Sequence, residues 1–147
     1  MYKVLVMLHV LGATMWTGGH LVLVFGFLPS ALRTRDPRAI LAFESRYERV
    51  GMPALAVQVI TGFVLAHNLL PDVSLWFSFS AGAPRQIAVK LILLAATIVL
   101  AVDARLRIIP RLSVGNLVNM LLHIIGITIL SVLFVLVGVG IRFGGLF

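Results

Sequence analysis

Long apolar stretches, separated by short polar stretches, are the main pattern along the chain. Four of them predict membrane-spanning helices, because about 20 apolar residues in a helix cross the hydrocarbon core of a bilayer. They cover residues 4–28, 51–70, 87–104 and 117–141. Pro29 is expected to end the first helix or to mark the membrane boundary. The short connections favour an all-α fold, an integral membrane, antiparallel four-helix bundle with one domain over residues 1–147.

The polar stretch after the first span carries a helix-start signal. Asp36 is a suitable N-cap residue, and Pro37 suits the first helical position. Ile40, Phe43 and Tyr47 follow at helical spacing. We therefore expect a short amphipathic helix along the membrane surface, with a direct continuation into the second span as the alternative.

The stretch after the second span is too short and too mixed to cross a membrane. Its apolar residues Leu75, Trp76, Phe77 and Phe79 are typical of a segment in the headgroup region. A lid over a ligand bound near His67 is the alternative. Within the second span, Gln58 and Thr61 are expected to form interhelical hydrogen bonds.

Composition supports the membrane prediction. The chain has 147 residues, of which 61% are hydrophobic and 12% charged, whereas a soluble domain is about half apolar and about a quarter charged. The absence of cysteine excludes disulfides, thiolate metal sites and covalent c-type haem. We expect no cleavable signal peptide, because the first apolar run is too long for one.

The net charge of +7 indicates orientation rather than nucleic-acid binding, because the basic residues cluster in the short polar stretches. Eight of them lie on one predicted side: Arg33, Arg35, Arg38, Arg46, Arg49, Arg105, Arg107 and Arg111. The other side has Lys3, Arg85, Lys90 and Arg142. The positive-inside rule then predicts a multi-pass protein of the bacterial inner (cytoplasmic) membrane with both termini periplasmic.

Four histidines fall within the predicted spans. His9 and His20 are eleven residues apart, so both rings leave the same helix face, about 16 Å apart along the axis. Counted from the span ends, His9 and His67 lie at nearly the same outer level, and His20 and His123 at nearly the same inner level. Ionisable side chains inside a membrane are costly, so these residues are candidate functional residues.

Two histidines on facing helices are what b-type haem requires, and the two layers predict one or two haem groups. His20 with His123 is the preferred axial pair, followed by His9 and then His67.

Other residues suit the same cofactor. Gly12, Gly19 and Gly126 are placed to let a macrocycle approach the helix backbone. Lys90 or Arg85 is expected to meet the haem propionates.

Copper is the alternative cofactor, because Cu(I) prefers imidazole and thioether ligands. Met120 and His123 are three residues apart on one predicted helix, and His20 lies at a similar depth. His9 and His67 are further candidate ligands. Methionines in an apolar chain also serve as core filler, and the third reading is a non-catalytic subunit whose histidines only pack.

Four stretches carry a resemblance to a known family: H-V-L-G-A-T-M-W-T-G-G-H at 9–20, R-Y-E-R-V-G-M-P-A-L-A-V-Q-V-I-T-G at 46–62, K-L at 90–91 and D-A-R-L-R-I-I-P-R-L at 103–112. They resemble the copper resistance D (CopD) family of bacterial membrane proteins. The H-x6-W-x-G-G pattern is also similar to HemJ-type haem-binding membrane proteins. On that likeness, His9 and Lys90 correspond to the family's helix 1 histidine and helix 3 lysine, whereas His20 and His123 lie outside the pattern.

The CopD likeness implies copper uptake or tolerance, and the HemJ likeness implies haem and redox chemistry. Together with the histidine layers, this favours a b-type cytochrome that transfers electrons at the membrane, either as an electron carrier or as a membrane oxidoreductase. Its donor and acceptor would be a quinol or a periplasmic protein. The chain is also compatible with a homo-oligomer.

Overall fold

The computed structural model describes residues 1–143, which form helices joined by short connections, with no strand among them. The elements are α1 (Tyr2–Val22), η1 (Leu23–Phe27), α2 (Leu28–Thr34), α3 (Arg38–Leu69), η2 (Val73–Phe77), α4 (Ala83–Asp103), η3 (Ala104–Ile108), η4 (Ile109–Arg111), η5 (Val114–Asn116) and α5 (Leu117–Arg142).

Four helical stretches are long and apolar enough to cross a membrane. They are Tyr2–Thr34, Arg38–Leu69, Ala83–Arg111 and Leu117–Ile141. The all-helical fold class and the number of helices long and apolar enough to span are therefore as predicted. The apolar surface of these helices indicates a lipid bilayer as the environment.

The first helix continues past Pro29, so the expectation that it ends there is wrong. The turn before the proline, η1, is a wide π-helical turn in which the Leu28 N–H donates to the Leu23 carbonyl, five residues back. A proline in a helix has no N–H to donate and clashes with the carbonyl four residues earlier. The wider turn accommodates the proline, and α2 follows without a break.

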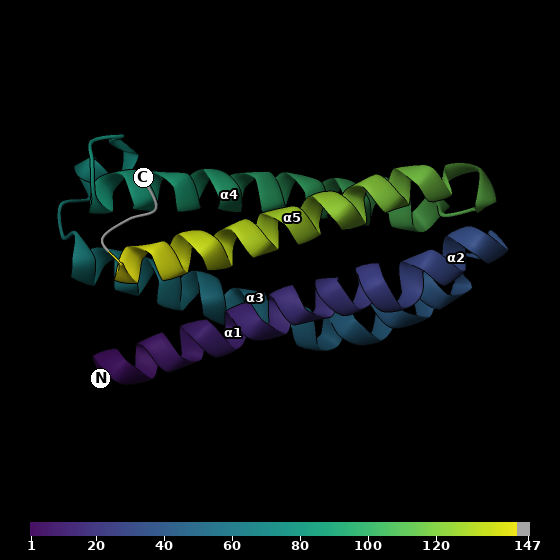
Figure 1. The fold of residues 1–147 in the computed structure, drawn as a ribbon, viewed down its shortest axis with the longest axis horizontal. Helices are drawn as coiled ribbons and strands as arrows, with labels where there is room; N and C mark the ends of the chain where they lie inside the picture. Colours follow the sequence, from purple (N-terminus) through teal and green to yellow (C-terminus); the bar gives the residue numbers. More distant parts are fainter. Residues whose placement is uncertain (144–147) are drawn as a thin grey trace.

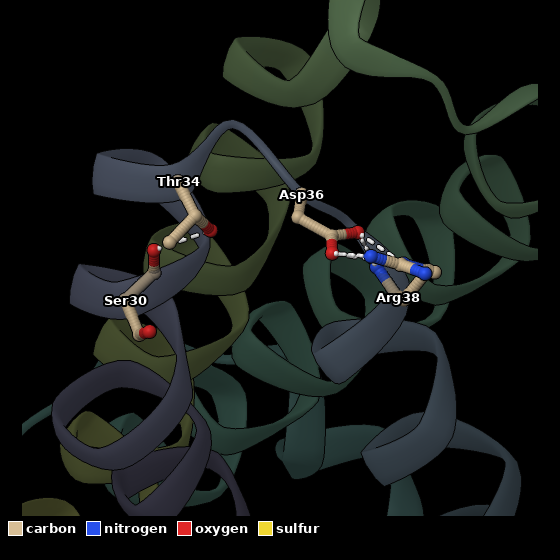
Figure 2. A network of polar contacts seen from close by, with 4 residues as sticks. All are labelled: Ser30, Thr34, Asp36 and Arg38. Carbon is tan, nitrogen blue, oxygen red and sulfur yellow. Dashed lines mark hydrogen bonds and ion pairs between the residues drawn. The ribbon is translucent and has the colours of Figure 1, made fainter.

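The expected surface helix is not a separate element, because α3 is continuous from Arg38 to Leu69. Ile40 is completely buried, so the apolar face of this stretch packs against the other helices instead of a membrane surface. The helix start lies one residue later than predicted: Pro37 is the N-cap and α3 begins at Arg38, whose backbone N–H donates to Asp36 Oδ1 at 3.0 Å (Figure 2). The Arg38 guanidinium also donates to Asp36 and holds the pKa of this carboxyl below its usual value.

The four long helices pack mainly as two pairs, α1 with α3 and α4 with α5, and α1 also packs against α5 (Figure 1). The start of α1 and the last turns of α5 lie at the same end, which we call the terminal end. The opposite end holds the α2–α3 turn and residues 104–116, and we call it the basic end because the eight arginines named above lie there.

An apolar core lies towards the basic end and joins η1, α2, α3 and α5. Its buried members are Leu23, Leu28, Ala31, Ile40, Leu117, Met120 and Ile124. Burial of these side chains against one another holds the first two helices onto the last one.

The connection between α3 and α4 is held by Trp76, which is 7% exposed. Its ring stacks on Phe63 with centroids 6.0 Å apart, and its Nε1–H donates to the Leu70 carbonyl at 2.8 Å. Phe77 and Phe79 are exposed, as expected for residues that meet headgroups. The tryptophan thus closes the connection against α3.

Candidate functional site

A group of polar side chains lies in the half of the helices nearer the terminal end, and we call it the central polar set: His9 of α1, Gln58 and Thr61 of α3, and Lys90 of α4. His9 Nδ1 is 2.9 Å from the Gln58 carbonyl oxygen and 3.0 Å from Thr61 Oγ1. The interhelical hydrogen bond predicted for Thr61 is therefore confirmed.

The hydrogen bonds of His9 determine which ring nitrogen carries a proton. A carbonyl oxygen only accepts, so Nδ1 is the N–H that donates to Gln58. The Thr61 hydroxyl donates to the Val57 carbonyl at 2.6 Å and can accept from the same Nδ1–H. In neutral His9 the lone pair therefore lies on Nε2, where it is available to a ligand.

Lys90 lies within electrostatic range of the His9 ring. Its side chain is half-buried and runs along α5: a Cβ at Gly138 would lie 3.3 Å from Nζ. Among residues 1–143, no acceptor holds its ammonium group in a hydrogen bond or ion pair. Gly62 of α3 lies beside His9 in the same way that Gly138 lies beside Lys90, since a Cβ at Gly62 would lie 3.1 Å from His9 Cε1. The two glycines leave room for both side chains.

Gln58 has a buried atom without a partner. Its side chain is 9% exposed, and Oε1 has no hydrogen-bond partner among the described residues. Buried polar atoms in native proteins are almost always paired, so an unpaired one calls for a ligand, an ion or a water. The sequence identified Gln58 only as a hydrogen-bonding residue, and its position three residues before Thr61 was the one signal that placed it on the same face.

The second histidine of the predicted outer pair is not near this set. His67 is exposed and lies six residues beyond Thr61, about 9 Å closer to the terminal end. The expected equal depth of His9 and His67 is therefore wrong. Arg85 lies at the start of α4, where its Nε–H donates to the Phe79 carbonyl at 3.2 Å.

His20 is 8% exposed and is enclosed by aromatic rings. Its centroid lies 4.6 Å from Trp16 and 5.6 Å from Tyr47, whose ring is perpendicular to it. His20 Nδ1 donates to the Trp16 carbonyl at 2.8 Å. The Tyr47 hydroxyl donates to the same carbonyl at 2.9 Å.

His123 has both ring nitrogens in hydrogen bonds. Nδ1 lies 2.9 Å from the Asn119 carbonyl, and Nε2 lies 2.7 Å from Asp103 Oδ2. Both ring nitrogens are therefore occupied by hydrogen bonds in this arrangement, so a metal would have to displace one of these two partners. Asp103 also meets Arg107 at 3.3 Å.

The predicted axial pair His20 and His123 does not face across the helices. Thr17 Oγ1 donates to the Ser131 carbonyl at 3.3 Å and sets the level of α1 against α5. His20 lies three residues from that level and His123 eight residues, both towards the basic end. The two histidines are therefore offset by about 7 Å along the axis.

The glycines expected beside a macrocycle are used for helix packing. A Cβ at Gly12 would lie 2.9 Å from the Ala54 carbonyl oxygen, and one at Gly19 would lie 2.0 Å from the Tyr47 ring. A Cβ at Gly126 would lie 3.1 Å from Leu100. These glycines let the helices approach each other closely.

The predicted copper ligands are likewise separated by their packing. Met120 is 3% exposed within the apolar core, whereas His123 is bonded to Asp103. In the described part of the chain, no three His, Cys, Asp or Glu side chains are grouped as a metal site. Copper binding stays a prediction.

Comparison of the chain with protein-family models, with characterised proteins and with solved structures finds no match. The CopD and HemJ resemblance therefore stays a prediction that depends on the sequence motifs alone.

Proposed function

We propose that this protein is an inner-membrane four-helix bundle that binds b-type haem at the central polar set and transfers electrons. The observation that carries the proposal is His9. Its Nδ1–H is held by Gln58, its Nε2 has no hydrogen-bond partner among residues 1–143, and Lys90, which has no ion-pair partner among those residues, lies within electrostatic range. Ionisable groups inside a membrane are costly and generally functional. The eight arginines favour a cytoplasmic basic end and periplasmic termini.

Different residues of the central polar set would hold different parts of the haem. The Gln58 carbonyl and Thr61 hydroxyl orient the His9 ring, as hydrogen-bond acceptors on the far nitrogen do for metal-bound histidines. Lys90 supplies a cation for a propionate carboxylate. Bound haem would supply reversible one-electron transfer.

Close packing limits where a porphyrin can lie. Ala54 and Gln58 of α3 leave no space beside Gly12 of α1. The porphyrin would therefore not lie between α1 and α3 at that level. The offset between His20 and His123 makes His9 the preferred ligand in place of that pair.

The test is an absorbance spectrum of the detergent-purified protein, oxidised and then reduced with dithionite. We expect a haem Soret band in the wild-type protein and its loss in His9→Ala. His67→Ala is the matched control, because His67 is exposed, and it should keep the band. The double variant His20→Ala/His123→Ala should also keep it.

Three results would contradict the proposal: a folded wild-type protein with a featureless spectrum, full haem content in His9→Ala, or loss of haem only in the double variant. Metal analysis of the same sample has a separate outcome. Copper at about one per chain without haem bands would support the copper alternative.

A further inference from the structure

A groove of about 490 Å³ lies on the outside of α3 near the basic end, far from the central polar set. It is lined by Phe27, Ala39, Ala42, Phe43, Arg46, Tyr47 and Val50. Six of these seven residues have apolar or aromatic side chains, and Arg46 is the one cation. The groove therefore combines an apolar wall with a single positive charge.

The aromatic wall of the groove is rigid. Phe43 stacks on Tyr47 with centroids 5.4 Å apart and meets Phe27 at 4.9 Å. The Tyr47 hydroxyl is bonded to the Trp16 carbonyl, and its ring fills the space left by Gly19. The aromatic wall is therefore already formed without a ligand, and its side chains would lose little conformational freedom when a ligand binds.

Arg46 is the cation of the groove lining, and it has no carboxylate partner among residues 1–143. In residues 1–143, Asp36 pairs with Arg38, Glu48 with Arg105, and Asp103 with Arg107, and no ion pair includes Arg46. Glu44, the remaining carboxylate at this end, lies within electrostatic range of Arg105. The charge that lines the groove is therefore free to meet an anion from outside.

The groove lies where the lipid headgroups would be. The 32 residues of α3 are about 48 Å long, whereas the hydrocarbon core is about 30 Å thick. The excess of about 18 Å corresponds to residues 38–50, the part that carries both the arginines and the groove. A ligand bound there is at the boundary between acyl chains and charged headgroups.

We propose that this groove binds an acidic phospholipid of the cytoplasmic leaflet. The phosphate would lie against Arg46 and an acyl chain along the wall of Phe27, Phe43 and Val50. Eight arginines against four carboxylates at this end favour an anionic headgroup over a zwitterionic one. The inference uses the membrane orientation of the proposed function but not the haem.

The test uses native mass spectrometry of the full chain, freed of lipid in detergent. The probes are phosphatidylglycerol and phosphatidylcholine with identical acyl chains. We expect the wild-type protein to prefer phosphatidylglycerol, and Arg46→Gln to lower that affinity about fivefold. Arg49→Gln makes the same change of charge three residues away, outside the groove lining, and should have less than about a twofold effect.

A second pair of variants tests the apolar part. Ala42→Trp fills the groove and should reduce binding of both lipids, whereas Ala56→Trp adds the same bulk to an exposed site of α3 outside the groove. Circular dichroism checks that each variant is folded. If Ala42→Trp does not fold, the two arginine variants alone test the proposal. Equal effects of the two arginine variants, equal binding of the two lipids, or unchanged binding by folded Ala42→Trp would overturn the proposal.

Haem content, read from the absorbance spectrum of the same samples, is expected to stay unchanged in all four variants. The lipid proposal and the haem proposal can therefore fail separately. Lipid preference without haem would leave the groove assignment in place, and haem without lipid preference would leave the central polar set in place.

Discussion

The central polar set and the basic end both contain charged and polar side chains, but half-buried groups of the basic end form ion pairs that the central polar set lacks among the described residues. At the basic end, His123 meets Asp103, Asp103 meets Arg107, and Glu48 meets Arg105. In the central polar set, Lys90 has no anion among the described residues, and Gln58 Oε1 has no hydrogen-bond partner.

This difference separates structural polar groups from functional ones. A paired group near the end of a helix stabilises the arrangement of helices and needs nothing further. An unpaired group in an apolar environment lowers stability, so its presence indicates a ligand that completes it. By this criterion His9, Gln58 and Lys90 are the functional candidates, and His123 is a structural residue.

The largest effect is expected from the tight contact between α1 and α3 towards the basic end. Gly19→Val would place new atoms inside the Tyr47 ring, since even a Cβ would lie 2.0 Å from it. We expect the free energy of unfolding to fall by about 3 kcal/mol, read as a lower thermal midpoint in detergent. Gly18→Val is the matched control, because nothing lies within 4 Å of its Cβ position. Equal losses in both variants would mean that helix propensity, rather than packing, is responsible.

The next effect tests the pairing at the basic end. Asp103→Ala leaves the His123 Nε2–H, 2.7 Å from the carboxylate in the wild type, without its acceptor. We expect a loss of about 2 kcal/mol in unfolding free energy and unchanged haem content. Asp103→Asn retains an acceptor and should lose less. If haem is lost while the protein stays folded, the basic end belongs to the functional site and the comparison is wrong.

A smaller effect of the opposite sign is expected in the central polar set. Lys90→Met removes an unpaired, half-buried cation and should raise the free energy of unfolding by about 1 kcal/mol while lowering haem content. Lys3→Met makes the same change at an exposed position and should alter neither quantity. A loss of stability in Lys90→Met would show that Lys90 has a structural partner.

The smallest effect concerns the exposed pair between α2 and α3. Hydrogen bonds from Arg38 lower the pKa of Asp36, so the folded state favours its ionised form. The stabilisation of the folded state by this pair is therefore present above the ordinary Asp pKa of about 3.9. It is lost as the pH falls through the lower pKa of the folded state. We expect Asp36→Asn to flatten this part of the thermal midpoint–pH curve slightly. An identical curve in wild type and variant would show that the pair contributes nothing.

The parts of the fold that were predicted correctly depend on composition and short-range signals. The four apolar helices follow from the length of their apolar runs, and Asp36 and Pro37 predict the start of α3 to within one residue. The expectation that the first helix ends at Pro29 was wrong because the η1 turn accommodates the proline. That turn depends on backbone hydrogen bonding that the residue pattern does not predict.

The histidine pairs were misplaced for a different reason. Counting residues from span ends assumes that all helices end at one level. The actual levels are set by close contacts such as those of Gly12 with Ala54 and of Thr17 with Ser131, which shift His67 and His123 away from the assumed partners.

The sequence by itself determined that the chain forms four apolar helices, that its arginines gather at one end, and that His9 and His20 share a helix face. These properties depend on neighbours along the chain, through helix geometry and the cost of exposing apolar surface. Only the tertiary structure decided which polar atoms are paired. Pairing depends on the register between helices, which brings Gln58 to His9 and Asp103 to His123 and leaves Lys90 and Gln58 Oε1 without partners among the described residues.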